Sequence, residues 1–325
     1  FFKQKTAYEI RNCDWSSDVC SSDLVCAAAV QAGEGPDALL KVPAESEAGV
    51  QKRLVKACTA WKRNVLLNAL PPEQAAQLRS ASGAGAGSWL LPPTGPENQL
   101  ANPHFLTAVA LRLRLPPPPG SSSRCSHRRP GGQLCGVDLS ADPAHPLVCP
   151  VGGSTCVRHD AVRDWLAAWL KARGAAGVAT EQWVPAWDRP RRDGEGVEAA
   201  RLDVAFADPA GGMLYVDVSV TSAASGAGTP EGRSRATRNG AAAAAMEERK
   251  HRRYPGGGLV PFVLEAHGRL GLEAQSLLRR WAADDADLCA ARQALAATLQ
   301  RANADAYLSA VRPFAAHFRA ARAGA

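Results

Sequence analysis

Residues 201–222, RLDVAFADPAGGMLYVDVSVTS, constrain the fold of this chain more than any other stretch. Apolar residues alternate with polar or small ones over positions 202–206 and again over 214–220, and Asp-Pro and Gly-Gly lie between the two runs. Period-2 alternation around turn-forming residues is typical of two antiparallel strands joined by a tight loop. The stretch therefore predicts a β-hairpin.

The expected register of this hairpin opposes two acidic side chains. With the turn centred on Ala210, Val204 faces Val216, and Asp203 lies opposite Asp217 on the other face. A slip of one residue would set apolar against polar side chains, so the parity of the register is well determined. Two carboxylates about 5 Å apart repel by roughly 3 kcal/mol at an effective dielectric of about 20. A proton, a basic neighbour or a divalent cation such as Mg²⁺ can offset this repulsion. The alternatives are two solvated aspartates on an open sheet face, or a register shifted by two.

Length and charge narrow the class of protein. The 325 residues carry a net charge of +7 and are 46% hydrophobic, which is enough to bury one or two cores. The basic balance fits a polyanionic partner, although Arg- and Ala-rich composition also reflects a GC-rich genome. No apolar run approaches the length that spans a bilayer, and the N-terminus lacks the layout of a signal peptide. We therefore expect an intracellular chain without a membrane partner, whose nine cysteines are metal ligands or buried thiols.

The first 24 residues resemble a short-read sequencing adapter translated in frame. Lys3–Glu9, KQKTAYE, and Cys13–Leu24, CDWSSDVCSSDL, correspond to its two constant halves. Residues 1–24 are therefore expected to be an artefact that takes no part in the fold. The natural chain is therefore expected to be truncated before Val25.

The remaining sequence divides into four regions. Residues 25–115 predict helices with amphipathic stripes. Residues 116–157 contain a Pro-rich linker followed by a Cys/His segment. Residues 158–268 predict, in order, a helix, three strands, a second helix and a final strand. Residues 269–325 predict two or more Ala/Leu/Arg-rich helices.

A zinc site is predicted in the Cys/His segment. Its expected ligands are separated by nine, nine and three residues and surrounded by Gly, Pro and Ser: Cys125, Cys135, His145 and Cys149. Four such ligands in a short, loop-rich segment fit a closed tetrahedral zinc site, around which a segment poor in apolar residues can fold. The alternatives are scattered cysteines, or a site in which His127 or Cys156 replaces one ligand.

The order of elements in residues 158–268, with acids on the central hairpin, resembles the restriction-like endonuclease core of the PD-(D/E)xK superfamily. Over roughly residues 50–285 the motifs together resemble the C-terminal region of non-LTR retrotransposon polyproteins, in which a CCHC zinc motif and a restriction-like endonuclease follow a reverse transcriptase. The motifs that carry this resemblance are Trp89…Leu115, the four zinc ligands, Arg158-His159, Leu202-Asp203, Asp217-Val-Ser-Val-Thr221, Lys250…Arg253-Tyr254 and Val263-Leu-Glu265…Gly268.

The resemblance implies an α/β fold: a mixed sheet flanked by helices, with helical extensions at both ends and a small zinc-binding segment. Residues 25–115 would then be the remnant of the segment that follows the reverse transcriptase, which this chain lacks because it contains no YxDD-type motif.

The same resemblance implies roles for individual residues. Asp203 and Asp217 would bind Mg²⁺ (or Mn²⁺) and act in catalysis with Lys250. The superfamily's usual lysine position is Ser219 here, and the usual Pro before the first acid is Leu202. Four arginines would hold the DNA backbone: Arg158, Arg249, Arg252 and Arg253. For Arg249, Arg252 and Arg253 the alternative is a solvated helix face. His159 and Tyr254 belong to the motifs without a derived role, and local helix capping is the alternative for His159.

The implied function is a metal-dependent endonuclease that nicks target DNA in the nucleus for target-primed reverse transcription. Its partners would be the DNA target and, through the missing polymerase, the RNA of the element. One alternative is a catalytically inactive, zinc-containing nucleic-acid-binding fragment of a degenerate element. Another is a helical structural protein, in which Asp203 and Asp217 would lie far apart.

Overall fold

The computed structural model describes residues 47–191, 194–224 and 229–312, and the chain divides into two compact units, Phe1–Pro71 and Pro72–Ala325. The adapter-like residues 1–24 and the last part of the predicted C-terminal helices, 313–325, lie outside the described residues, as does 25–46. The elements are α4 (Glu47–Ala69), α5 (Pro72–Ala81), η1 (Ser88–Leu90), η2 (Pro96–Asn98), α6 (Asn102–Leu113), η3 (His145–Leu147), α7 (Ser154–Ala172), β1 (Ala179–Trp183), η4 (Pro185–Trp187), β2 (Arg189–Pro190), β3 (Val197–Glu198), β4 (Arg201–Ala207), β5 (Met213–Thr221), α8 (Pro230–Ala236), α9 (Ala241–Arg253), β6 (Leu259–Glu265), α10 (Leu272–Trp281) and α11 (Asp285–Ala310).

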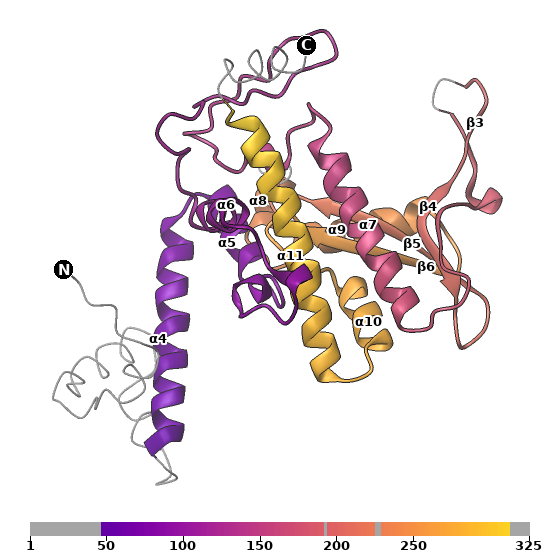
Figure 1. The fold of residues 1–325 in the computed structure, drawn as a ribbon, viewed down its shortest axis with the longest axis horizontal. Helices are drawn as coiled ribbons and strands as arrows, with labels where there is room; N and C mark the ends of the chain where they lie inside the picture. The colour runs from indigo at the N-terminus through magenta and orange to yellow at the C-terminus, as the bar shows by residue number, and fades with distance from the viewer. Residues whose placement is uncertain (1–46, 192–193, 225–228, 313–325) are drawn as a thin grey trace, which may run out of the picture. The chain divides into compact units, whose positions relative to one another are not determined.

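The second unit is built on a mixed four-stranded sheet in the order β1-β4-β5-β6 (Figure 1). The first three strands pair antiparallel, and β6 pairs parallel to β5 after a crossover through α8 and α9. A parallel pair needs such a crossover, whereas antiparallel neighbours need only a short loop. The chain is therefore a mixed α/β protein with helices flanking the sheet, as the sequence predicted.

The β4–β5 hairpin has the predicted register. Val204 pairs with Val216 and Phe206 with Leu214, and the intervening loop turns through Gly211 and Gly212. Both glycines have positive φ, which is a conformation that residues with a Cβ rarely adopt. The alternation of apolar residues was therefore sufficient to define how these two strands pair.

Helices cover both faces of the sheet. The apolar face of the hairpin shares one core with α7, α10 and α11, and α7 and α11 cross in front of the sheet in Figure 1. Phe206 and Phe262, at the centre of this core, are completely buried. The opposite face of β5 and β6 contacts α9. Asp217 on β5 faces this side of the sheet, where Lys250 of α9 lies 2.7 Å from its carboxylate.

The long helix α11 connects the sheet to the Cys/His segment. It has 26 residues, begins at the capping side chain of Asp284, and buries many alanines that allow neighbouring helices to approach closely. It packs on α7 and α6, and its C-terminal end accepts backbone hydrogen bonds from Ser122 and Ser126. The Cys/His segment is thus attached to the same unit as the sheet.

Among the helices that the structure describes, none is long and apolar enough to cross a membrane.

Candidate active site and metal centre

The first acid of the hairpin, Asp203, lies where the paired part of β4 and β5 ends. The β4–β5 ladder reaches from Ala207 to Val204, so Asp203 is not a ladder partner of Asp217 as the sequence predicted. Instead, its Oδ2 atom accepts the backbone N–H of Val218 at 2.6 Å. On β1, the other strand beside β4, Glu181 is at the position opposite Asp203 and has a backbone φ of 54°. Such strained conformations in non-glycine residues concentrate at functional sites.

The second acid, Asp217, is paired with a lysine from the far side of the crossover. Lys250 Nζ on α9 lies 2.7 Å from Asp217 Oδ2, and both side chains are largely buried. Burial raises the pKa of Asp217, the positive charge of Lys250 opposes that rise, and the negative charge of Asp203 adds to it. The structure therefore brings Asp203, Asp217 and Lys250 together. This contradicts the alternative of a helical structural protein, in which the two acids would lie far apart.

His159, for which the sequence suggested no role, belongs to the same cluster. It is placed by the first turns of α7, and its Nε2 atom lies 3.2 Å from Asp203 Oδ2. Its Nδ1 atom lies 3.2 Å from the exposed carboxylate of Asp160. The hydrogen bond to Asp203, with the nearby Asp160, raises the pKa of His159 to about 9. The imidazole is therefore largely protonated at neutral pH, and each acid of the cluster has its own cationic neighbour.

Basic side chains of α9 border this cluster on the surface. A groove of about 410 Å³ is lined entirely by cationic residues: Arg189, Arg249, Lys250, Arg252 and Arg253. Arg253 forms an ion pair with Glu198 on β3 at 2.7 Å, and Arg252 forms one with Glu248 at 2.6 Å. Three of the four arginines expected to hold a polyanion thus line one groove together with Lys250.

The fourth arginine, Arg158, is placed differently from the expectation. Its side chain is only 3% exposed and donates a hydrogen bond to Asn303 of α11 at 3.0 Å. A nucleic-acid backbone has no access to a guanidinium at this depth, so Arg158 holds α7 to α11 instead. Arg158 and His159 are consecutive on a helix, and consecutive helical side chains point in different directions.

Tyr254 is also buried. It follows the last residue of α9 and packs against Trp187, with ring centroids 5.4 Å apart, in a small core that includes Leu202. Burial raises the pKa of Tyr254, and the charge of Asp217 adds to that rise. The ring therefore supports the end of α9, and through it the position of Lys250.

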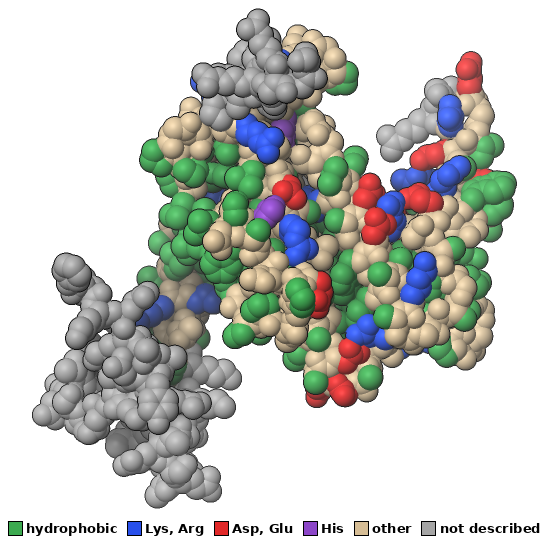
Figure 2. All heavy atoms as spheres, viewed as in Figure 1, with side chains coloured by type: hydrophobic (Ala, Val, Ile, Leu, Met, Phe, Trp, Pro, Cys, Tyr) green, Lys and Arg blue, Asp and Glu red, His purple; other side chains and the backbone are tan. Residues whose placement is uncertain are grey.

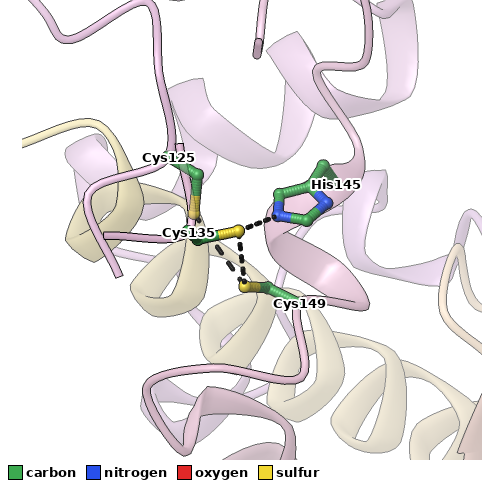
Figure 3. Close-up of side chains that lie close together, drawn as sticks. All are labelled: Cys125, Cys135, His145 and Cys149. Atoms are coloured by element: carbon green, nitrogen blue, oxygen red, sulfur yellow. Dashed lines mark hydrogen bonds between the residues drawn. The ribbon is translucent and has the colours of Figure 1, made fainter. Parts of the chain in front are cut away.

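The predicted zinc ligands converge on one point. The ligand atoms of Cys125, Cys135, His145 and Cys149 all lie within 4.8 Å of one another (Figure 3). The Sγ atom of Cys149 lies 3.9 Å from that of Cys125 and 3.7 Å from that of Cys135. A tetrahedral ion with Zn–S bonds of about 2.3 Å separates its sulfur ligands by about 3.8 Å. The cluster can therefore bind a metal such as zinc.

A short hairpin explains the unusual nine-residue spacing of the first two cysteines. Isolated bridges pair Arg124 with Asp138 and Arg128 with Leu134, so the two cysteines come from opposed segments. The short helix η3 supplies His145, and Cys149 follows two residues after its end. Paired segments thus replace the CxxC turn that more compact zinc sites use.

The alternative ligands do not join the cluster. His127 Nε2 lies 2.8 Å from the hydroxyl of Ser309 on α11, and Cys156 is exposed on the first turn of α7. Cys125 and Cys149 are buried, and burial raises the pKa of the Cys125 thiol to about 12. Within the described part of the chain, this cluster is the one group of at least three His, Cys, Asp or Glu residues that can hold a metal ion.

The sequence matches no known protein-family model and has no significant match among curated proteins. The geometry of the two clusters is therefore the basis for assigning a function.

Proposed function

We propose that this chain is the metal-dependent DNA endonuclease module of a non-LTR retrotransposon, with a restriction-like core. The observation that carries the proposal is the meeting of Asp203, Asp217 and Lys250 on one side of a mixed sheet. The acids come from adjacent antiparallel strands and the lysine from the helix of the crossover that leads to a parallel strand. The groove of basic residues beside them fits a polyanionic substrate.

The donor set fits a hard divalent cation. Mg²⁺ and Mn²⁺ prefer oxygen ligands, and two neighbouring carboxylates provide them. Within the described residues, the buried Oδ2 atom of Asp217 has the Lys250 ion pair and no hydrogen-bond donor of good geometry. Asp203 and Asp217 would hold the ion, which when bound supplies Lewis-acid polarisation of a phosphoryl oxygen and a more acidic water.

The residues of the chain then divide the work of hydrolysis. An oxygen of water forms a bond to phosphorus, the bond from phosphorus to the leaving oxygen breaks, and that oxygen takes up a proton while solvent receives one from the water. The ammonium of Lys250 offsets the negative charge that develops on the phosphoryl oxygens. The exposed arginines on α9, Arg249 and Arg252, hold the backbone without reading bases. The DNA target, an associated polymerase with its RNA, and a nuclear site of action follow from this proposal.

A nicking assay tests the proposal. Supercoiled plasmid is incubated with the purified chain in Mg²⁺, in Mn²⁺ or in EDTA, and relaxed circles are measured. We expect nicking that requires a divalent ion and that Asp217→Asn abolishes while DNA binding persists. The matched control is Asp164→Asn, an exposed carboxylate on α7, which should nick as the wild type does. Equal nicking by Asp217→Asn would refute the assignment.

One observation favours a second candidate, a zinc-containing nucleic-acid-binding fragment without activity. Ser219 stands where the superfamily places its lysine, and the Cys/His cluster is the more complete metal site. For this second candidate we expect salt-sensitive binding of nucleic acid and no relaxed circles with Mg²⁺ or Mn²⁺.

A further inference from the structure

A second groove lies between α8 and α9, outside the candidate active site. Its volume is about 860 Å³, and four arginines and two glutamates are among its lining residues: Arg235, Arg238, Arg249, Arg252, Glu231 and Glu248. Glu248 is engaged by Arg252, so the remaining arginines dominate the charge that the groove presents. Arg238 is exposed, and Arg235 is half-buried.

This groove shares lining residues with the basic groove at Lys250. Arg249 and Arg252 line both of them, and Lys250, which lies between these two in the sequence, is paired with Asp217. The helix that separates α8 from the acids has 13 residues and is therefore about 20 Å long. That length corresponds to about six steps of a B-DNA strand.

The geometry points to a single track, formed by the two grooves together, that binds the phosphate backbone of duplex DNA and leads it from α8 to the acids. This inference rests on the proposed function for the direction of the track, which ends at Asp203 and Asp217. Its new residues are Arg235 and Arg238 on and just after α8, which the sequence did not single out.

The lining favours duplex DNA over a single strand. Among the described residues, neither groove is lined by an aromatic side chain, whereas sites for single strands combine cations with aromatic rings on which bases stack. Guanidinium groups bind phosphate oxygens through planar pairs of N–H donors.

Binding without cleavage tests the track. A labelled duplex of about 30 base pairs is titrated with the full chain in EDTA, by fluorescence anisotropy, over a series of salt concentrations. Each lost phosphate contact lowers the slope of log Kd against log salt by about 0.9. For Arg235→Gln with Arg238→Gln we expect a slope lower by about 2, and weaker binding to every duplex sequence.

The matched control removes two exposed cations from helices on the other face of the sheet, Lys171→Gln with Arg279→Gln. It should bind with the wild-type slope. Because Arg235 is half-buried, Arg238→Gln alone serves as the variant whose folding is not at risk, with an expected slope change of about 1.

The track would be overturned if the double variant and Arg238→Gln alone both kept the wild-type slope. It would also be overturned if the wild type bound a single DNA strand or an RNA of the same length more tightly than the duplex. The result is independent of the proposed activity. A wild type that binds through Arg235 and Arg238 but never nicks would refute the nuclease and keep the track. If the wild type nicks but these variants bind DNA as the wild type does, the track is refuted and the nuclease is kept.

Discussion

At the level of single residues, each acid of the candidate active site has a different cationic neighbour. His159 contacts Asp203 from α7, and Lys250 contacts Asp217 from α9. The repulsion expected between two opposed carboxylates is relieved by these cations and by the backbone N–H of Val218. Residues from three parts of the chain therefore offset part of the repulsion in this site.

Removing the lysine tests its assignment separately from the acids. Lys250→Gln should lower the nicking rate by about a factor of 100, since one group that stabilises developing charge contributes that much in other enzymes. Single-turnover nicking measures the loss, and Lys171→Gln, an exposed lysine on α7, is the control. A rate equal to that of the wild type would remove Lys250 from the chemistry.

His267 predicts a dependence of stability on pH. Burial, with the charges of Arg114, Arg158 and Arg112, lowers the pKa of His267 to about 4. The unfolded chain takes up a proton near pH 6.5, and the folded chain does so only near pH 4. The free energy of unfolding therefore falls as the pH drops from about 6.5 to about 4, by roughly 3 kcal/mol.

Chemical unfolding followed by tryptophan fluorescence at several pH values measures this fall. His267→Gln should be less sensitive over the same interval, while His251→Gln, an exposed histidine on α9, should behave as the wild type. Identical pH profiles for His267→Gln and the wild type would contradict the prediction.

At the level of elements, the Cys/His segment is held from two sides. Its four ligand atoms form one cluster, and Ser126 and His127 bond to the last turn of α11. Leu139 and Leu147 pack in a small core with Tyr307 of that helix. Loss of the metal should therefore disturb the end of α11 as well as the loops.

Chelation tests the metal site. The purified chain should contain one zinc ion, and Cys149→Ser should lose it, whereas Cys156→Ser, on an exposed cysteine outside the cluster, should retain it. Because zinc binding contributes directly to folding, the melting temperature should fall on chelation. Elemental analysis and thermal unfolding provide the measurements. Equal zinc content in the two variants would refute the ligand set.

The ion pair between Arg173 and Asp287 connects α7 to α11 and predicts a second pH effect. The hydrogen bond from Arg173, whose Nε lies 3.0 Å from Asp287 Oδ2, lowers the pKa of Asp287. The ion pair therefore stabilises the folded chain at pH values above the pKa that Asp287 has in the unfolded chain, about 4. This stabilisation is lost as the pH falls through the lower pKa that Asp287 has in the folded chain.

Asp287→Asn should destabilise the chain by about 1 kcal/mol at neutral pH, because the pair is partly exposed, and should flatten the acid limb of the stability profile. Asp285→Asn, an exposed carboxylate in the same helical turn, is the matched control. Urea unfolding at neutral and acidic pH measures both. An equal effect of the two variants would show that helix-terminal charge, and not the pair, is responsible.

At the level of the whole molecule, the sheet, its helices and the Cys/His segment belong to one unit, and α4 belongs to another. Apolar side chains gather on the surface over α6 (Figure 2), where Leu106 and Leu113 are more than 60% exposed. The second unit has its own cores and its own long helix, α11.

The division predicts that residues 72–325 fold without the first unit. This fragment should unfold at the same temperature as the full chain, to within a few degrees, and should lack the helical signal of α4. Circular dichroism with thermal unfolding measures both quantities. A fragment without a cooperative transition would show that the first unit contributes to the fold.

Much of the fold was predictable from local patterns. Alternation identified the hairpin and its register, and ligand type and spacing identified the four residues of the Cys/His cluster. Two expectations were wrong for physical reasons: Asp203 is not a ladder partner of Asp217, and Arg158 is buried. A strand end and the inward face of a helix both depend on what packs against them, which the pattern of one segment does not contain.

Alternation, candidate metal ligands and charge could all be recognised in the amino-acid sequence alone, because these are properties of single or neighbouring positions. That His159 reaches Asp203, 44 residues away, and that Arg235 and Arg238 line one groove with arginines of α9 emerges only in three dimensions. Contacts between distant segments depend on how the helices pack on the sheet. That packing results from the burial of many apolar side chains along the whole chain, and no single motif contains this information.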